Sequence, residues 1–173
     1  DKYSLQFTPY GALTLLLCRE AGAEVPDSSL KKLFSYLNSL NEENSGAVTE
    51  YFSAWVLARA GELSEAKLNK LLDKEMEWEK SQGHPSAVNH FCRLYLGLAL
   101  LELQGNTASE KALQLLGKTS AKTEPGYSGY VDMFWANGEE LELILGSRAA
   151  PEAEETQTAV VRFLNRKLED VRR

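Results

Sequence analysis

Histidine and cysteine, which supply most metal ligands and many nucleophiles in proteins, are scarce in this sequence. Its 173 residues include two of each. His84 and His90 are six positions apart and have no His-x-x-x-His or Cys-x-x-Cys companion, so the spacing of a zinc site is missing. We therefore expect no metal and no other cofactor. We interpret His84 as a loop residue and His90 as a residue at the start of a helix.

The two cysteines, Cys18 and Cys92, each lie in an apolar helical run. If the chain is an array of repeats, as argued below, these runs belong to units that are not neighbours, so a disulfide between them is not expected. We predict two buried free thiols that act as small hydrophobic side chains.

Sequence motifs for catalysis are also missing. There is no Gly-x-Ser-x-Gly, no phosphate-binding loop and no dinucleotide fingerprint, and no serine or cysteine has an obvious base partner. The carboxylate pairs Glu139-Glu140 and Glu154-Glu155 stand at expected helix starts, where they complement the helix dipole. We predict that the chain is not an enzyme.

Long apolar runs and clustered positive charge are absent as well. No stretch approaches the ~18 consecutive apolar residues of a membrane-spanning helix. The formal net charge is −6, and the basic residues are dispersed except near the end of the chain, which argues against a nucleic-acid partner. The sequence begins at Asp1 without a charged-then-apolar signal segment, and we expect it to be a fragment of a larger protein.

A weak internal repeat is the main positive feature. Four apolar helical stretches each end at a glycine and are followed by a polar turn and an amphipathic stretch. The marker glycines are spaced by 39, 44 and 41 residues: Gly22, Gly61, Gly105 and Gly146. A period of this size indicates stacked supersecondary units, none of which buries its apolar face alone.

The pattern predicts an all-α fold. No segment shows the alternation of a strand, and the chain divides into eight helices arranged as four antiparallel hairpins. The leading helix of each pair is the more uniformly apolar, so we expect leading helices inside and following helices outside, as in an α/α toroid. We predict one such domain over residues 1–173, with a first helix over 8–21 that has Pro9 in its first turn, a loop over 41–46 and a last helix over 151–171.

The longest predicted loop, residues 117–130, leads into an aromatic group that is the best candidate for a binding surface. Tyr127, Tyr130 and Trp135 accompany two glycines there, and such loops often line interaction sites. The alternative is that Phe134 and Trp135 anchor the loop on the core.

Three stretches carry a family likeness. They are Thr-Pro-Tyr-Gly-Ala-Leu with Arg-Glu-Ala-Gly in 8–22, Ala-Trp-Val-Leu-Ala-Arg-Ala-Gly-Glu at 54–62, and Glu-Thr-Gln-Thr-Ala-Val-Val-Arg-Phe-Leu at 155–164. They resemble hairpins of bacterial α2-macroglobulin-like proteins. The resemblance implies part of the thioester-type α/α toroid domain of a large protease-trapping, host-defence protein, periplasmic or secreted. Its implied partners are other domains of the parent chain, and a protease or another protein.

The chain departs from that family at the reactive motif. The family's Cys-x-Glu-Gln is absent, because Cys18 is followed by Arg19-Glu20-Ala21 and no glutamine stands three residues after Cys92. The expectation is therefore a non-catalytic module without a thioester motif of its own.

A tetratricopeptide-like solenoid is the alternative. Residues 97–105 followed by 112–116 are similar to such a repeat, which implies a cytoplasmic scaffold for a protein or peptide. The observed spacings exceed its usual ~34 residues by several positions. A terpenoid-cyclase-like enzyme on a toroid would need an Asp-rich string that the chain lacks.

Overall fold

The computed structural model describes residues 2–80, 87–119 and 138–172, and these residues are almost entirely helical, with no strand among them. The prediction of an all-α fold is thereby confirmed. The elements are α1 (Lys2–Glu20), α2 (Asp27–Ser39), α3 (Glu42–Ser45), α4 (Ala47–Arg59), α5 (Glu65–Lys80), α6 (Ala87–Gln104), the 3-10 helix η1 (Gly105–Ala108), α7 (Ser109–Thr119), α9 (Gly138–Ala149) and α10 (Glu154–Arg172).

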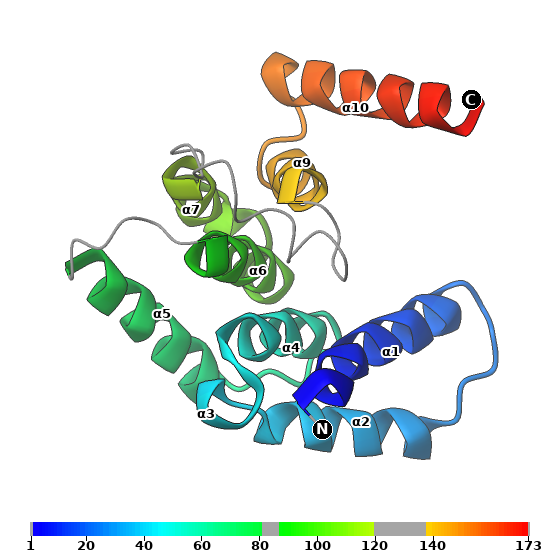
Figure 1. The fold of residues 1–173 in the computed structure, drawn as a ribbon, viewed down its shortest axis with the longest axis vertical. Coiled ribbons are helices and arrows are strands. Elements are labelled where there is room, and N and C mark those ends of the chain that lie inside the picture. Colours follow the sequence, from blue (N-terminus) through cyan, green and yellow to red (C-terminus); the bar gives the residue numbers. More distant parts are fainter. Residues whose placement is uncertain (1, 81–86, 120–137, 173) are drawn as a thin grey trace.

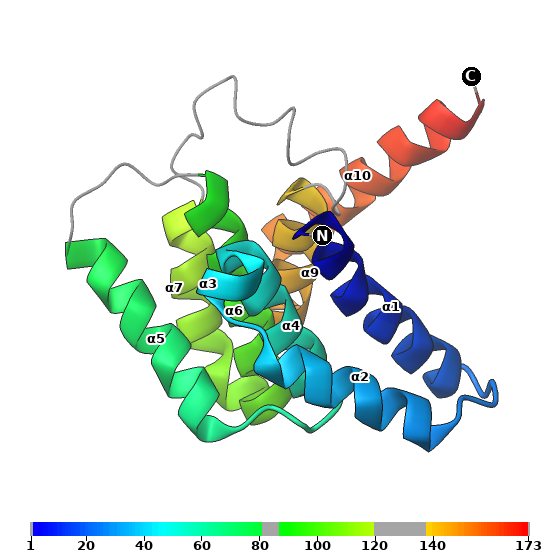
Figure 2. The same cartoon turned by 60° about the horizontal axis from the view of Figure 1, so that its bottom comes forward.

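The helices form two layers (Figures 1 and 2). The leading helices α1, α4, α6 and α9 make an inner row in which each contacts the next. The following helices lie outside it: α2 packs on α1 and α4, α5 on α4 and α6, α7 on α6 and α9, and α10 on α9. Each outer helix before α10 therefore bridges two successive inner helices.

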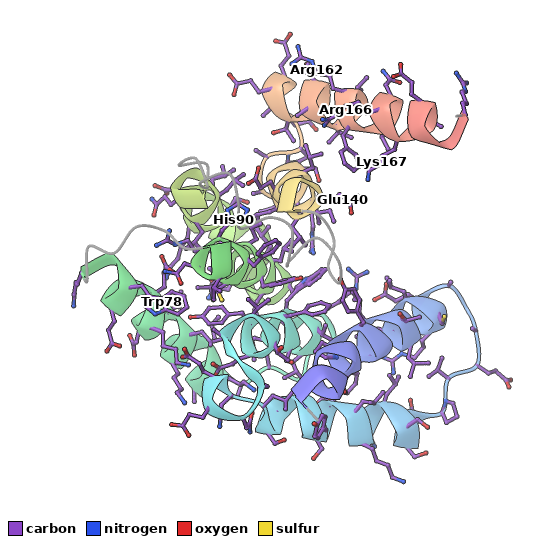
Figure 3. The ribbon with its side chains drawn as sticks, in the orientation of Figure 1. Trp78, His90, Glu140, Arg162, Arg166 and Lys167 are labelled. Atoms are coloured by element: carbon purple, nitrogen blue, oxygen red, sulfur yellow. The ribbon has the colours of Figure 1, made fainter. Side chains whose placement is uncertain are left out.

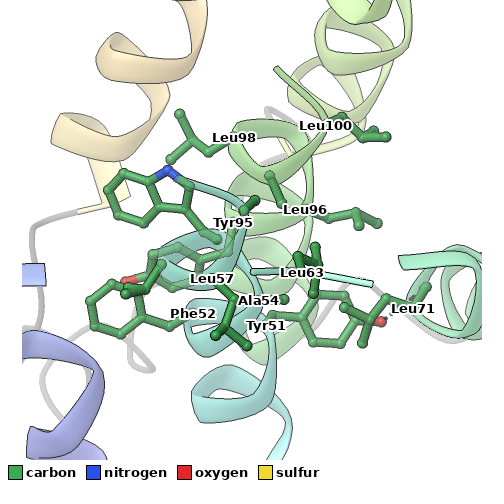
Figure 4. Close-up of a cluster of buried hydrophobic side chains, with 14 of the residues drawn as sticks. Tyr51, Phe52, Ala54, Leu57, Leu63, Leu71, Tyr95, Leu96, Leu98 and Leu100 are labelled. Carbon is green, nitrogen blue, oxygen red and sulfur yellow. Dashed lines mark hydrogen bonds between the residues drawn. The ribbon is translucent and has the colours of Figure 1, made fainter. Parts of the chain in front are cut away.

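Burial is greatest in the middle of the inner row. Almost every residue of α4, and of α6 from His90 to Leu101, is buried. The end helices are less covered because each has only one inner neighbour among the described residues: Leu17 of α1 is 46% exposed and Ile144 of α9 is 39% exposed. Figure 4 shows the aromatic and leucine side chains of α4 and α6 meeting at the centre.

Three of the four marker glycines end their helices as predicted. Gly22, Gly61 and Gly105 have positive φ values of 90°, 74° and 57°, a conformation that glycine adopts at little cost. The prediction for Gly146 is wrong, because α9 continues to Ala149. A Cβ at this position would lie 3.6 Å from Leu116 of α7 and 3.9 Å from Thr156 of α10, so the glycine instead stands where three helices meet.

Several predicted boundaries also differ. The first helix begins at Lys2, which places Pro9 inside it rather than in its first turn. Four residues of the predicted loop 41–46 form α3, whose start is stabilised by reciprocal hydrogen bonds between Asn41 and Asn44. The last helix begins at Glu154 rather than 151, because the preceding residues form a turn.

The prediction for the cysteines is half right. Cys92 is buried in α6, but Cys18 is exposed. Ala12 and Leu16 supply the buried positions of this part of α1, and Cys18 lies on the opposite side of the helix. Both thiols are free.

Substituting Leu100 tests the central position of α6. Leu100 is 1% exposed, so Leu100→Ala leaves a cavity and is expected to lower the free energy of unfolding by about 2–5 kcal/mol. Leu103→Ala is the matched control on the same helix, because Leu103 is 36% exposed and its truncation is expected to cost about 1 kcal/mol or less. Urea unfolding measures both. Equal losses would contradict the inner position of α6.

Candidate functional site

A groove lies between the outer helices α5 and α7. Its volume is about 460 Å³. The lining residues are Asn69, Leu72, Asp73, Glu75 and Met76 of α5 and Lys111, Gln114 and Leu115 of α7. In Figure 1 the two helices stand apart on either side of α6.

The groove combines an apolar strip with polar edges. Leu115 is buried and Leu72 half-buried, while Met76 is 49% exposed and therefore free to adapt to a partner. Asp73 and Lys111 are exposed lining residues of opposite charge, one from each helix. An apolar strip with charges of both signs at its edges can contact the side chains and backbone of a polypeptide.

A buried ion pair links α5, one of the two helices that line the groove, to the inner helix α6. Arg93 of α6 donates from Nε to Oε1 of Glu75 over 2.6 Å, and the two side chains are only 9% and 5% exposed. Charges removed from water this far are costly unless they are paired, so the pair constrains where α5 can lie relative to α6.

Further polar contacts hold the rest of α5. Nζ of Lys74 lies 2.7 Å from the carboxylate of Glu50 in α4, which is buried. It also lies 3.3 Å from the exposed carboxylate of Glu42 in α3. Burial by itself would lower the pKa of Lys74, but its hydrogen bond to Glu50 and the nearby negative charges raise the pKa overall. The hydroxyl of Tyr51 in α4 donates to the carbonyl of Leu71 over 3.1 Å.

The start of α5 is anchored on α2. The Oγ of Ser64 accepts a hydrogen bond from the backbone N–H of Lys67 over 3.2 Å and so caps the start of the helix. Nζ of Lys67 donates to three carbonyls at the end of α2, those of Leu37, Asn38 and Leu40, at 3.1–3.2 Å. A cation in this place complements the negative end of the helix dipole. Burial lowers the pKa of Lys67.

A second set of charges links the inner helices at one end. Arg59 of α4 makes two hydrogen bonds to the carboxylate of Glu20 in α1, at 3.0 and 2.6 Å, and lies 3.5 Å from Glu102 of α6. Glu102 also accepts from Arg148 of α9. We call Glu20, Arg59, Glu102 and Arg148 the inner-row ladder.

The ladder shows that the four inner helices are parallel, because each contributes a residue from its C-terminal part to the same edge. The hydrogen bond to Arg59, opposed by partial desolvation and aided by the arginine's charge, lowers the pKa of Glu20. A sequence signal for the ladder existed: its members lie two or three residues from the marker glycines, with charges that alternate in sign.

The three residues predicted to form a binding surface lie in a part of the chain that the structure does not describe. Tyr127, Tyr130 and Trp135 lie outside the described residues, as do Phe134 and His84. His90, labelled in Figure 3, lies in the first turn of α6, as predicted. Its Nε2 is 3.3 Å from Oε1 of Glu142 in α9.

No cluster of three histidine, cysteine or acidic side chains able to hold a metal ion occurs within the described residues. No helix in that part is both long enough and apolar enough to cross a bilayer.

No family model, curated protein or solved structure matches the chain. The groove and the inner-row ladder therefore have to be interpreted from their own chemistry.

The pair under the groove is open to a double-mutant cycle. Glu75→Met or Arg93→Met alone removes one charge of the buried pair and is expected to cost about 3–5 kcal/mol of stability. The double variant Glu75→Met/Arg93→Met is expected to cost much less than the sum, because it removes both charges. Urea unfolding measures the cycle. Additive losses would contradict a direct interaction between the two side chains.

Proposed function

We propose that the chain is a non-catalytic helical module of an α2-macroglobulin-like protein, exported with its parent chain, and that it has no thioester of its own. The observation that carries the proposal is the order of the two layers. Successive leading helices stand parallel in one row, and each outer helix up to α7 bridges two of them. This order supports a module built to hold its surfaces in fixed positions for other domains or a protein partner.

The environments of the cysteines support the absence of a thioester. Such a bond must be shielded from water, and Cys18 is exposed. Burial, followed by the nearby carboxylates, raises the pKa of the Cys92 thiol well above its usual value, so this thiol stays protonated and weakly nucleophilic. Gln104, Gln114 and Gln157 are all exposed.

Intact-mass measurement with methylamine tests the proposal. The intact mass is expected to equal the mass calculated from the full sequence, because no thioester forms. A thioester would lower the mass by one ammonia. Methylamine is expected to add no mass and to release no thiol. The denatured chain should titrate as two free thiols before and after treatment. A mass lower by one ammonia that methylamine converts to an adduct would contradict the proposal. A full-length thioester-containing macroglobulin is the positive control.

The α5–α7 groove favours a second candidate, a scaffold that binds an extended peptide. Its apolar strip with charges of both signs suits such a ligand. Selection of one defined peptide from a random display library, with binding lost in Met76→Glu and kept in Leu113→Gln, would favour this candidate. Both substituted side chains are exposed, at 49% and 38%, and Leu113 does not line the groove.

A further inference from the structure

The last outer helix, α10, has an apolar stripe that nothing among the described residues covers. Val161, Leu164 and Leu168 recur at helical spacing and are 57%, 53% and 55% exposed. The side of α10 toward α9 is different, because Phe163 is half-buried there and Lys167 lies 3.0 Å from Glu140 of α9 (Figure 3). The exposed stripe is about a third of a turn away from that contact.

The other outer helices show what normally fills this position. Each of α2, α5 and α7 packs on its own inner helix and on the next inner helix of the row, whereas the main contact of α10 within the described residues is with α9. Figure 1 shows α10 at the end of the row, with no further helix of the described residues beside it. The stripe of α10 therefore lies where a next inner helix would pack.

The inner-row ladder predicts the charge at the C-terminal end of a helix that would extend the inner row. The inner-row ladder alternates from Glu20 through Arg59 and Glu102 to Arg148, so its next member should be acidic. Glu102 serves two arginines at once, which shows that one member can contact a partner on each side. The side chain of Arg148 is still 34% exposed.

We infer that the α9–α10 end binds α1 of a second copy of this chain, head to tail. α1 satisfies the charge requirement, because it ends at Glu20. Its side away from α4 carries the exposed small residues Gly11, Thr14 and Cys18, which allow another helix to approach closely. In the contact, Glu20 of one copy lies near Arg148 of the other, and α1 covers the stripe of α10. The contact is heterologous and goes beyond the proposed function.

Self-association of the full 173-residue chain tests this inference. Sedimentation velocity from ~1 μM to ~1 mM should show concentration-dependent association, a range that covers weak and moderate complexes. Val161→Gln/Leu164→Gln removes the stripe and keeps helix-forming residues, and Thr14→Lys places a long charged side chain on the opposing surface. Each variant should weaken association about tenfold or more. The control Leu113→Gln removes an exposed leucine from α7 and should leave association unchanged.

Mixing the two defective variants separates this contact from a symmetric one. Each variant retains one intact end, so a 1:1 mixture should form a heterodimer that grows no further.

In the Leu164→Cys variant, a short thiol-reactive crosslinker should join Cys18 of one copy to the introduced thiol on α10 of the next, and Cys18→Ser should abolish the product. Persistence of the crosslink without Cys18 would indicate an α10–α10 contact and overturn the inference. A monomer at every concentration would also overturn it.

Discussion

The packing of α4 against α6 is the contact on which the rest of the structure depends. Within the described residues, these are the two inner helices with an inner neighbour on both sides, and they supply most of the fully buried large side chains. Phe52 and Tyr95 stack with ring centroids 4.8 Å apart, and Trp55 stacks on Tyr95 at 5.8 Å. Aromatic contacts of this kind add directional preference to a large burial of apolar surface.

Neighbouring helices are positioned from this pair by different means. α9 approaches α6 closely because position 97 is glycine, where a Cβ would lie 2.9 Å from Leu145 of α9. α5 is positioned by its buried leucines Leu68 and Leu71 and also by charge, through the Glu75–Arg93 pair and the contact of Lys74 with Glu50. Buried pairs of this type add little net stability, and we interpret them as fixing the orientation of α5 and therefore the width of the groove.

The positions of the helices could be predicted from the sequence better than the exposure of individual residues on them. Apolar periodicity and the glycine stops located the helices, because burial and helix termination leave local signals. Gly146 misled the prediction because, in the sequence, a glycine inside a helix cannot be told from a glycine that ends one. Cys18 misled it in another way, since its exposure depends on α1 having no inner neighbour on one side, which no local pattern encodes.

The candidate site was harder to predict for a similar reason. The groove forms between residues 69–76 and 111–115, which are distant in sequence and lie on helices that read as ordinary amphipathic stretches. The inner-row ladder could have been found, because Glu20, Arg59 and Glu102 stand at matching points of the repeat. Recognising it requires the register of the repeats to be known first.

Native-state hydrogen exchange tests the central role of the α4–α6 contact most directly. At a concentration where the chain is monomeric, amides in the middle of α4 and α6 should exchange only through global unfolding and so be the slowest in the protein. Amides of α10, whose main contact is with α9, should open at a much lower free energy, with those of α5 in between. Protection of α10 equal to that of α6 would contradict this account.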